Sequence, residues 1–497
     1  MLKTLYRQAA VAAATGLLAA GCTVGPDYKK PPVTVPPAFK EAAPPEMAAA
    51  ATRELKPAQP QDAASRGKWW VVFHDSQLNA LEEQVAVSNQ TIAQAEARYR
   101  AARAAVLGVR SGLFPTVTAG ASTSRSHASS TRSIVRQSLP GLTVTDYQLP
   151  IDFTYEIDSW GRVRRSVEAS VAGAQATAAD LATATLSMQS ELALDYFQLR
   201  GLDAEKQLLD STVAGYEKAL QLTQLRHNQG VASGVDVAQA ETQLATVRAQ
   251  STDLGVSRAQ FEHAIAVLTG RPPAGFTLPA SQAAVAPPAI PPMLPADLLQ
   301  RRPDIAAAER SVAAANAQIG VAKAAYFPAL GLTASGGLES STLSTLLSWP
   351  SRFWSLGPSL VETIFDGGRR RAATEQATAG WEQSVAVYRQ SVLSAFEDVE
   401  DNLAALRILA QEATEQAAAV DAAQRSLDLA NSRYQGGITT YLEVITAQAA
   451  ALANQRTAIE LATRRMVASV LLVKALGGGW NVSELPSSRA VAASPTK

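Results

Sequence analysis

The stretch NQTIAQAEARYRAARAAVLGVRSGLFP (residues 89–115) aligns without a gap on RPDIAAAERSVAAANAQIGVAKAAYFP (residues 302–328). Both stretches are rich in alanine, and both end in Phe-Pro. The paired positions that carry the same residue include Ile92 and Ile305, Glu96 and Glu309, and Phe114 and Phe327. The match suggests that the chain contains the same structural unit twice.

Two further blocks repeat in the same order. RHNQGVASGVDVAQAE (residues 226–241) aligns on RYQGGITTYLEVITAQ (residues 433–448), and DSWGRVRR (residues 158–165) aligns on FDGGRRRA (residues 365–372). Chance similarity between alanine-rich helices could explain one matched block, but hardly all of them in one order. The sequence therefore predicts an internal duplication.

Proline is absent from residues 151–271 and from residues 359–485, which predicts long helices because proline interrupts helices and central strands. In the first of these segments apolar residues recur every three or four positions, as in the seam of a coiled coil. They are Leu192, Leu199, Leu202, Leu209, Val213, Tyr216 and Leu220. A helix over residues 162–228 would be roughly 100 Å long at about 1.5 Å per residue. Such a rod exceeds what a compact globular core needs.

A different pattern precedes each rod. YQLPIDFTYEID (residues 147–158) alternates apolar and polar residues, which predicts a strand with one apolar and one polar face. Weaker versions lie at residues 113–126, 327–338 and 353–365. Taken singly, such a strand also fits a half-buried hairpin of a soluble protein. The aromatic residues near the strand ends fit the girdle of a membrane barrel, and they are Tyr147, Tyr155, Trp160, Trp349 and Trp354. Four strands cannot close a barrel, because about eight are needed, so several chains would have to contribute.

The N-terminus carries a secretory signal. MLKTLYR is basic, and the apolar run that follows is too short to span a bilayer. The run ends before Cys22, the only cysteine, in a stretch that resembles a lipobox, although Ala19 stands where leucine is commonest. We expect cleavage before Cys22, acylation of this residue and sorting to outer membrane lipid, because Thr23 follows it instead of aspartate. An ordinary signal peptide with an incidental cysteine is the alternative.

Composition excludes several classes of function. Lys+Arg and Asp+Glu balance at 44 each, which argues against a nucleic-acid surface. The four histidines have no partner at the spacing of a metal pair, and G-x-S-x-G, Walker and G-x-G-x-x-G motifs are absent. The sequence therefore predicts neither enzyme activity nor a metal site nor a cofactor.

The motifs GCTVGPDYKKP, KWWVVFHDSQLNAL, RRPDIAAAE and FDGGRRR follow one another in the order found in a known family. Over essentially its whole length the chain resembles the TolC-type outer membrane factors, specifically the lipoprotein (NodT-like) branch that serves resistance-nodulation-division pumps. The resemblance implies a mainly α fold with a membrane β-barrel portion. It also implies a homotrimer in which four strands per chain form one 12-stranded barrel, while the long helices form a tunnel. Substrate would come from an inner-membrane pump through a periplasmic adaptor protein.

Two alternatives stay open. A channel of a type I protein secretion system would share the fold, and a lipid-anchored coiled-coil scaffold would share the helices and the acylated cysteine. The expected segments are a signal peptide (1–21), an extended linker (22–74), a first repeat (75–285), a second repeat (286–480) and a tail (481–497). The pore-lining residues give no indication of the cargo.

Candidate site residues fall into three groups. At the strand-to-helix junctions glycine suits an unusual backbone, and lipid phosphate would favour the basic residues that follow; these residues are Gly161, Arg162, Gly368 and Arg369. The turns of the two helical hairpins are expected to contact the adaptor through Gly230, Val231, Ser233, Asp236, Gly437, Ile438, Thr440 and Glu443. The resemblance places a periplasmic gate at Leu442 and Thr446, with threonine where relatives carry an acidic residue.

Overall fold

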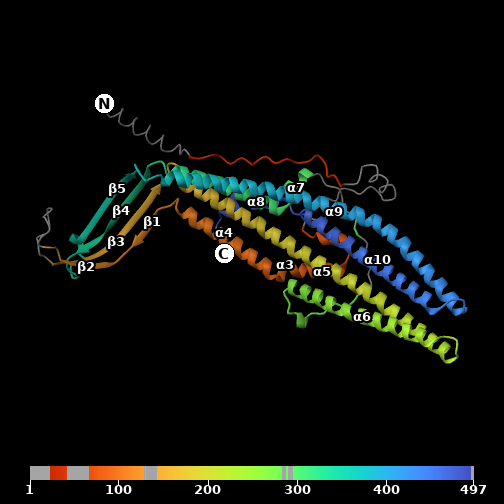
Figure 1. Ribbon diagram of the computed structural model, residues 1–497. Coiled ribbons are helices and arrows are strands. Elements are labelled where there is room, and N and C mark those ends of the chain that lie inside the picture. The colour runs from red at the N-terminus through yellow and green to blue at the C-terminus, as the bar shows by residue number, and fades with distance from the viewer. Residues whose placement is uncertain are drawn as a thin grey trace.

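The computed structural model describes residues 23–41, 67–127, 129, 143–281, 287–288 and 295–493. The expected signal peptide and Cys22 lie outside these residues. The molecule is elongated, with a sheet at one end and long helices that run away from it in the other direction (Figure 1). No helix within the described residues combines the length and the apolarity that a membrane crossing needs.

The helices confirm the duplication. The two longest helices have 67 residues each, their hairpin partners have 35 each, and the helices before the strands have 22 each. In this order they are α5 (Arg162–Asn228) and α9 (Arg369–Gln435), α6 (Gly234–Leu268) and α10 (Tyr441–Ala475), and α4 (Gln90–Ser111) and α8 (Pro303–Ala324). The helix predicted over residues 162–228 is confirmed at both ends.

Shorter helices complete the two halves. They are η1 (Trp69–Phe73), α3 (Ser76–Ser88), η2 (Pro273–Gly275), α7 (Pro295–Arg301), η3 (Trp349–Ser351), η4 (Val482–Glu484) and α11 (Ser488–Val491). Residues Trp69, Trp70 and Phe73 of η1 are buried in a cluster with Tyr196 and Phe197 of α5. The end of the segment expected as a linker is thus part of the helical core.

The N-terminal segment follows the helices of the second half. The Tyr28 hydroxyl donates a hydrogen bond to Glu309 of α8, and Phe39 is buried beside α9. Further on, the Glu41 N–H donates to the Glu400 carboxylate at 2.9 Å. Segments far apart in sequence are therefore joined along the outside of the helical body.

The strands form one antiparallel ribbon. They are β1 (Thr116–Ala119), β2 (Ser122–His127), β3 (Thr143–Ile157), β4 (Ala329–Ser340) and β5 (Arg352–Val361). The order is β1-β3-β4-β5, and β2 also pairs with β3. Strands β1 and β2 keep one register on β3, and Gly120 between them donates its N–H to the Pro150 carbonyl at 2.9 Å. Because Pro150 has no N–H to return, the ladder is interrupted there, and four strand positions result, as the sequence predicts.

Register gives the sheet two different faces, because residues paired across antiparallel strands point to the same side. One face is apolar, and its residues are Val117, Ala119, Ile151, Phe153, Tyr155, Ile157, Leu330, Leu332, Ala334, Trp354, Leu356, Pro358 and Leu360. The other face is polar, and its residues include Thr116, Thr118, Asp152, Thr154, Glu156, Thr333, Ser335, Ser355 and Ser359. Within the described residues the apolar face has no cover, since Trp354 is 82% exposed and Leu356 65%.

Trp160, predicted near the end of a strand, lies at the junction with α5. Its ring stacks on Phe327 with 4.9 Å between centroids, and its Nε1–H donates to the Pro328 carbonyl at 2.7 Å. Trp160 therefore ties the start of α5 to the end of α8.

Candidate functional site

The two strand-to-helix junctions use glycine in the left-handed region. Gly161 has φ 80° and Gly368 has φ 91°, and each is the residue before a long helix. This confirms the predicted need for a residue without Cβ. A Cβ on Gly161 would also lie 2.9 Å from Thr23, whereas one on Gly368 would meet nothing within 4 Å.

The first basic run pairs with acidic groups of the chain itself, so its position does not require lipid phosphate as a partner. Arg162 binds both oxygens of Glu156, at 2.8 and 2.6 Å. The Asp158 carboxylate accepts from the N–H groups of Val163 and Arg164, at 3.0 and 2.9 Å. A carboxylate at the amino end offsets the unfavourable position of arginine there.

The second basic run is also preceded by a carboxylate that accepts hydrogen bonds at the start of the helix, but only one of its arginines binds this carboxylate. Asp366 accepts from the N–H of Gly368 and from the side chain of Arg370, at 3.1 and 2.8 Å. Arg369 and Arg371 are exposed. The acidic residues that precede the two runs thus account for Arg162 and Arg370, whereas the lipid contact predicted for Arg369 stays a prediction.

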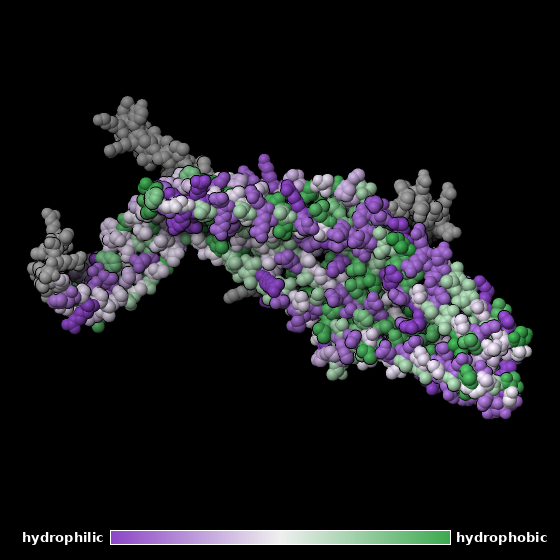
Figure 2. Space-filling model, in the orientation of Figure 1, coloured by the Kyte–Doolittle hydropathy of each residue, from purple (hydrophilic) through white to green (hydrophobic). Residues whose placement is uncertain are grey.

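At the opposite end of the molecule the two hairpin turns repeat one geometry. Gly230 and Gly437 have φ 76° and 74°. The residue after each glycine is apolar and projects outward, with Val231 64% exposed and Ile438 73%. Figure 2 shows hydrophobic residues among polar ones at these hairpin ends. The predicted tip residues thus form matched, exposed turns.

The two turns differ in their caps. Ser233 and Asp236 form a capping box at the start of α6, with Ser233 Oγ accepting from the Asp236 N–H at 3.2 Å and Asp236 accepting from the Ser233 N–H at 2.9 Å. Thr440, the matching residue before α10, makes no side-chain cap. Glu443, which matches Asp236, lies 3.6 Å from Arg433.

One contact that sequence reasoning missed joins the two hairpins. The Arg226 guanidinium of α5 donates to the Tyr434 carbonyl of α9 at 2.7 Å and lies over the Tyr434 ring at 4.6 Å from its centroid. Tyr434 in turn contacts Tyr441 of α10, with 5.3 Å between ring centroids. Burial, together with Tyr434, Tyr216 and Asp236 nearby, raises the pKa of Tyr441 to about 12.

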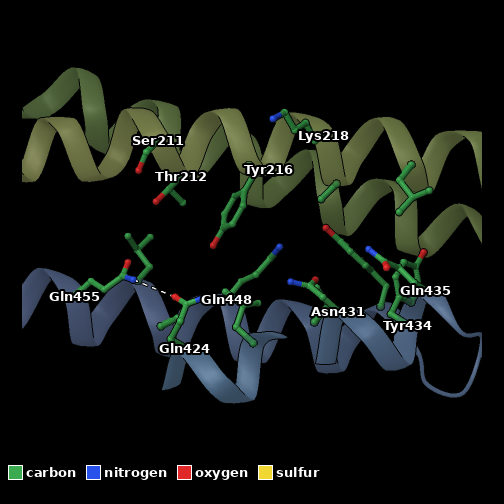
Figure 3. Close-up of a pocket in the computed structure, with 18 of the residues that line it drawn as sticks. Ser211, Thr212, Tyr216, Lys218, Gln424, Asn431, Tyr434, Gln435, Gln448 and Gln455 are labelled. Carbon is green, nitrogen blue, oxygen red and sulfur yellow. Dashed lines mark hydrogen bonds between the residues drawn. The ribbon is translucent and has the colours of Figure 1, made fainter. Parts of the chain in front are cut away.

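Between this contact and the body of the molecule, a groove of about 470 Å³ separates α5 from α9 and α10. Figure 3 shows the side chains of Tyr216, Gln448 and Asn431 directed into it, and a hydrogen bond between Gln455 and Gln424 crosses from α10 to α9. The lining mixes hydroxyl, amide and apolar groups. The two hairpins therefore touch near their ends and leave this groove between them, while Leu452 of α10 packs against the cluster of Leu209 and Tyr216.

The predicted gate residues lie just beyond the second turn. Leu442 is 57% exposed, so it is not part of a core formed by its own chain. The Thr446 hydroxyl donates to the Leu442 carbonyl at 2.9 Å, one helical turn earlier. The two side chains share one face of α10. No group of His, Cys, Asp and Glu residues able to hold a metal ion occurs among the described residues.

Comparison with known proteins places these features in a family. A family model described as outer membrane efflux protein matches residues 81–271 and 294–478, one match in each half. The chain is 33% identical to the probable efflux pump outer membrane protein SepC of Pseudomonas putida, over 98% of this chain and 99% of the relative. It is also 33% identical to the pyoverdine export outer membrane protein OpmQ of Pseudomonas aeruginosa, over 84% and 89% of the two chains.

Solved structures agree with this result. The outer-membrane channel OprN superposes with a TM-score of 0.82 at 31% sequence identity, over 92% of this chain and 100% of that one. Family match, relatives and fold coincide over nearly the whole length. The chain belongs to the outer membrane efflux protein family, and it is an efflux channel protein of the outer membrane.

Proposed function

We propose that three copies of this chain close a 12-stranded barrel in the outer membrane and form the exit channel of a tripartite efflux pump. The two-faced sheet is the observation that carries this proposal. Its apolar face suits lipid, its polar face suits a water-filled lumen, and β3, β4 and β5, with 15, 12 and 10 residues, have the length of membrane-spanning strands.

The edges of the sheet support a trimer. Within the described residues, β1 and β2 pair only with β3, and β5 pairs only with β4, so the ribbon has two free edges. Free edges and too few strands for closure are both resolved if β5 of one copy pairs with β1 and β2 of the next. Three copies of four strand positions give the proposed barrel, and the long helices then form a periplasmic tunnel.

The hairpin turns are the proposed contact with a periplasmic adaptor protein, and an inner-membrane pump of the resistance-nodulation-division class would supply the cargo. Support comes from the relatives named as efflux pump proteins and from the exposed apolar residues Val231 and Ile438 at the turns. We assign no cargo. The channel itself would perform no chemistry.

We place the periplasmic gate at Leu442, with three copies meeting at the trimer axis to exclude water. The exposure of Leu442 within its own chain supports a role between chains. Thr446 would line the same constriction without the charge of a carboxylate.

We also propose that Cys22 is the acylated N-terminus that anchors the channel in the membrane. Mass spectrometry of the mature protein tests this directly. A free Cys22, or cleavage elsewhere, contradicts it.

The barrel is tested by a cross-link between opposite edges. Thr118 of β1 and Ser359 of β5 lie on the polar face at the two edges of the ribbon. Cysteines at residues 116 or 118, combined in turn with cysteines at 355, 357 or 359, should give a covalent trimer on a non-reducing gel for at least one pair. Ser335→Cys, in the central strand β4, is the control and should give none. Native mass spectrometry that finds monomers only would overturn the proposal.

A further inference from the structure

The sheet has an inner and an outer end. Strands β3, β4 and β5 connect to α5, α8 and α9 at the end marked by Ile157, Ala329 and Val361. The opposite end carries the connection from β4 to β5, residues 341–351. With the helices in the periplasm, as in the proposed function, this connection lies at the outer leaflet.

Arg352 lies at the outer end of β5 on the lipid-facing side. It pairs with Leu338 of β4, which pairs with Leu149 of β3, and it shares its face with Trp354. Its side chain is exposed, and among the described residues it takes part in no ion pair. A cation at the edge of an apolar membrane band therefore has no anion within the described part of its own chain.

Trp349 and the loop hold this cation in place. The Arg352 guanidinium lies over the Trp349 ring at 3.0 Å from its centroid. The turn that carries Trp349 is fixed by Ser351 Oγ, which donates to the Thr345 carbonyl at 2.8 Å, and Thr345 Oγ1 lies 2.7 Å from Ser340 Oγ. Hydrogen bonds within the loop thus hold the turn that carries Trp349.

The surroundings of Arg352 match an amphiphilic anion. Leu343 and Leu347 of the same loop are 67% and 80% exposed, and Trp349 is 74% exposed. Apolar side chains with this exposure suit acyl chains, whereas the serine and threonine hydroxyls of the loop suit sugar and phosphate oxygens. Arginine is the side chain best suited to grip a phosphate with several donors.

We propose that Arg352 and Trp349 form a binding site for the phosphate group of the phosphorylated glycolipid in the outer leaflet. The occupant follows from charge complementarity and from the position of the site at the outer end of the apolar face. A glycerophospholipid offers a phosphate without the sugar, and it is the competing outcome that the experiment separates. The proposal rests on the membrane orientation given under the proposed function.

The test titrates purified full-length channel in detergent with diphosphoryl lipid A, dephosphorylated lipid A and phosphatidylglycerol, and counts bound lipid by native mass spectrometry. Wild-type protein should prefer diphosphoryl lipid A to both other lipids. Arg352→Gln should weaken that binding about fivefold, as expected for one basic side chain at an anionic surface. Arg352→Lys should keep part of it. Arg389→Gln removes an exposed arginine of α9, away from the sheet, and is the matched control that should bind like wild type.

Equal binding of dephosphorylated lipid A or of phosphatidylglycerol by the wild type would overturn the site, and so would unchanged binding by Arg352→Gln. The same spectra report the number of chains, and planar bilayers report conductance. Wild-type protein without trimers or channels would contradict the proposed function. Intact trimers with no preference among lipids would contradict the lipid site alone.

Discussion

The two repeats have helices of equal length but fix them to different degrees. In the first repeat Thr23 occupies the space that a Cβ on Gly161 would need, and the capping box of Ser233 and Asp236 fixes the start of α6. In the second repeat a Cβ on Gly368 would meet no described residue within 4 Å, and Thr440 provides no side-chain cap. We infer that the second hairpin moves at lower cost, and it is the one that carries the proposed gate.

The largest expected effect concerns the turns that the repeats share. Gly230→Leu and Gly437→Leu each place a residue with a bulky side chain at an exposed turn position whose backbone lies in the left-handed region. If both turns contact the adaptor, each variant should abolish resistance to exported compounds while trimers remain in the outer membrane. Antibiotic or solvent susceptibility, with quantification of membrane trimers, measures this. Normal resistance in either variant would remove that turn from the contact.

Between pH 5 and 9 we expect a pH effect from the first repeat. Glu82 of α3 is fully buried, and its carboxylate oxygens have no hydrogen-bond partner in the described part of the chain. Burial raises the pKa of Glu82 to about 9 from an ordinary 4.5. The folded state favours the protonated carboxyl of Glu82. The stability that depends on this protonation is therefore complete below pH 4.5 and is lost as pH rises toward 9. The free energy of unfolding should fall by on the order of 1 kcal/mol per pH unit in this window.

Glu82→Gln keeps the shape without the titration. Its unfolding temperature between pH 5 and 9 should therefore fall less steeply than that of the wild type, and the variant should be the more stable protein at pH 8. Parallel pH profiles for the two proteins would show that Glu82 is not held protonated.

The junction glycines should differ in their tolerance of alanine. At both, a Cβ in the left-handed region costs about 1–2 kcal/mol. Gly161→Ala has the additional contact with Thr23 and should lower the unfolding temperature more than Gly368→Ala. Adding Thr23→Gly should narrow the difference. Equal losses in the two single variants would mean that the N-terminal segment moves aside freely.

The smallest effect concerns the caps. Ser233→Ala should cost about 1 kcal/mol, a typical value for a lost N-cap, because Ser233 caps α6. Thr440→Ala removes no cap bond and should change little. Amide hydrogen exchange in the first turns of α6 and α10 resolves the two sites. If Thr440→Ala speeds exchange in α10 as much as Ser233→Ala does in α6, the two helix starts do not differ in their caps.

Much of the fold can be predicted because it is local or repeated. The absence of proline and the spacing of Leu192 and Leu199 indicate α5. The sequence repeat then predicts an equivalent helix, which the structure has at residues 369–435. The apolar face of β5 is weaker in sequence, since Pro358 and Gly357 interrupt the pattern. Pairing with β4 makes it continuous with the face of Ile151 and Phe153.

The contacts that sequence reasoning missed are not local. Arg226 and Tyr434 are 208 residues apart and meet because two hairpins of equal length end side by side. The aligned blocks contain both positions, with Arg226 matched to Arg433, but they do not indicate the pairing. The partners of the first basic run, Glu156 and Asp158, lie a few residues upstream. In sequence they belong to a polar strand face, and the turn into α5 brings them back onto the helix.

A gate in the second hairpin predicts that Leu442 differs from its counterpart in the first repeat, Val235. Both are exposed within the chain, at 57% and 64%. In planar bilayers Leu442→Ala should raise single-channel conductance and the frequency of opening markedly, whereas Val235→Ala should behave like wild type. Wild-type conductance in Leu442→Ala, with a lower unfolding temperature, would show that Leu442 only packs against a neighbouring chain and would contradict a gate in the second hairpin.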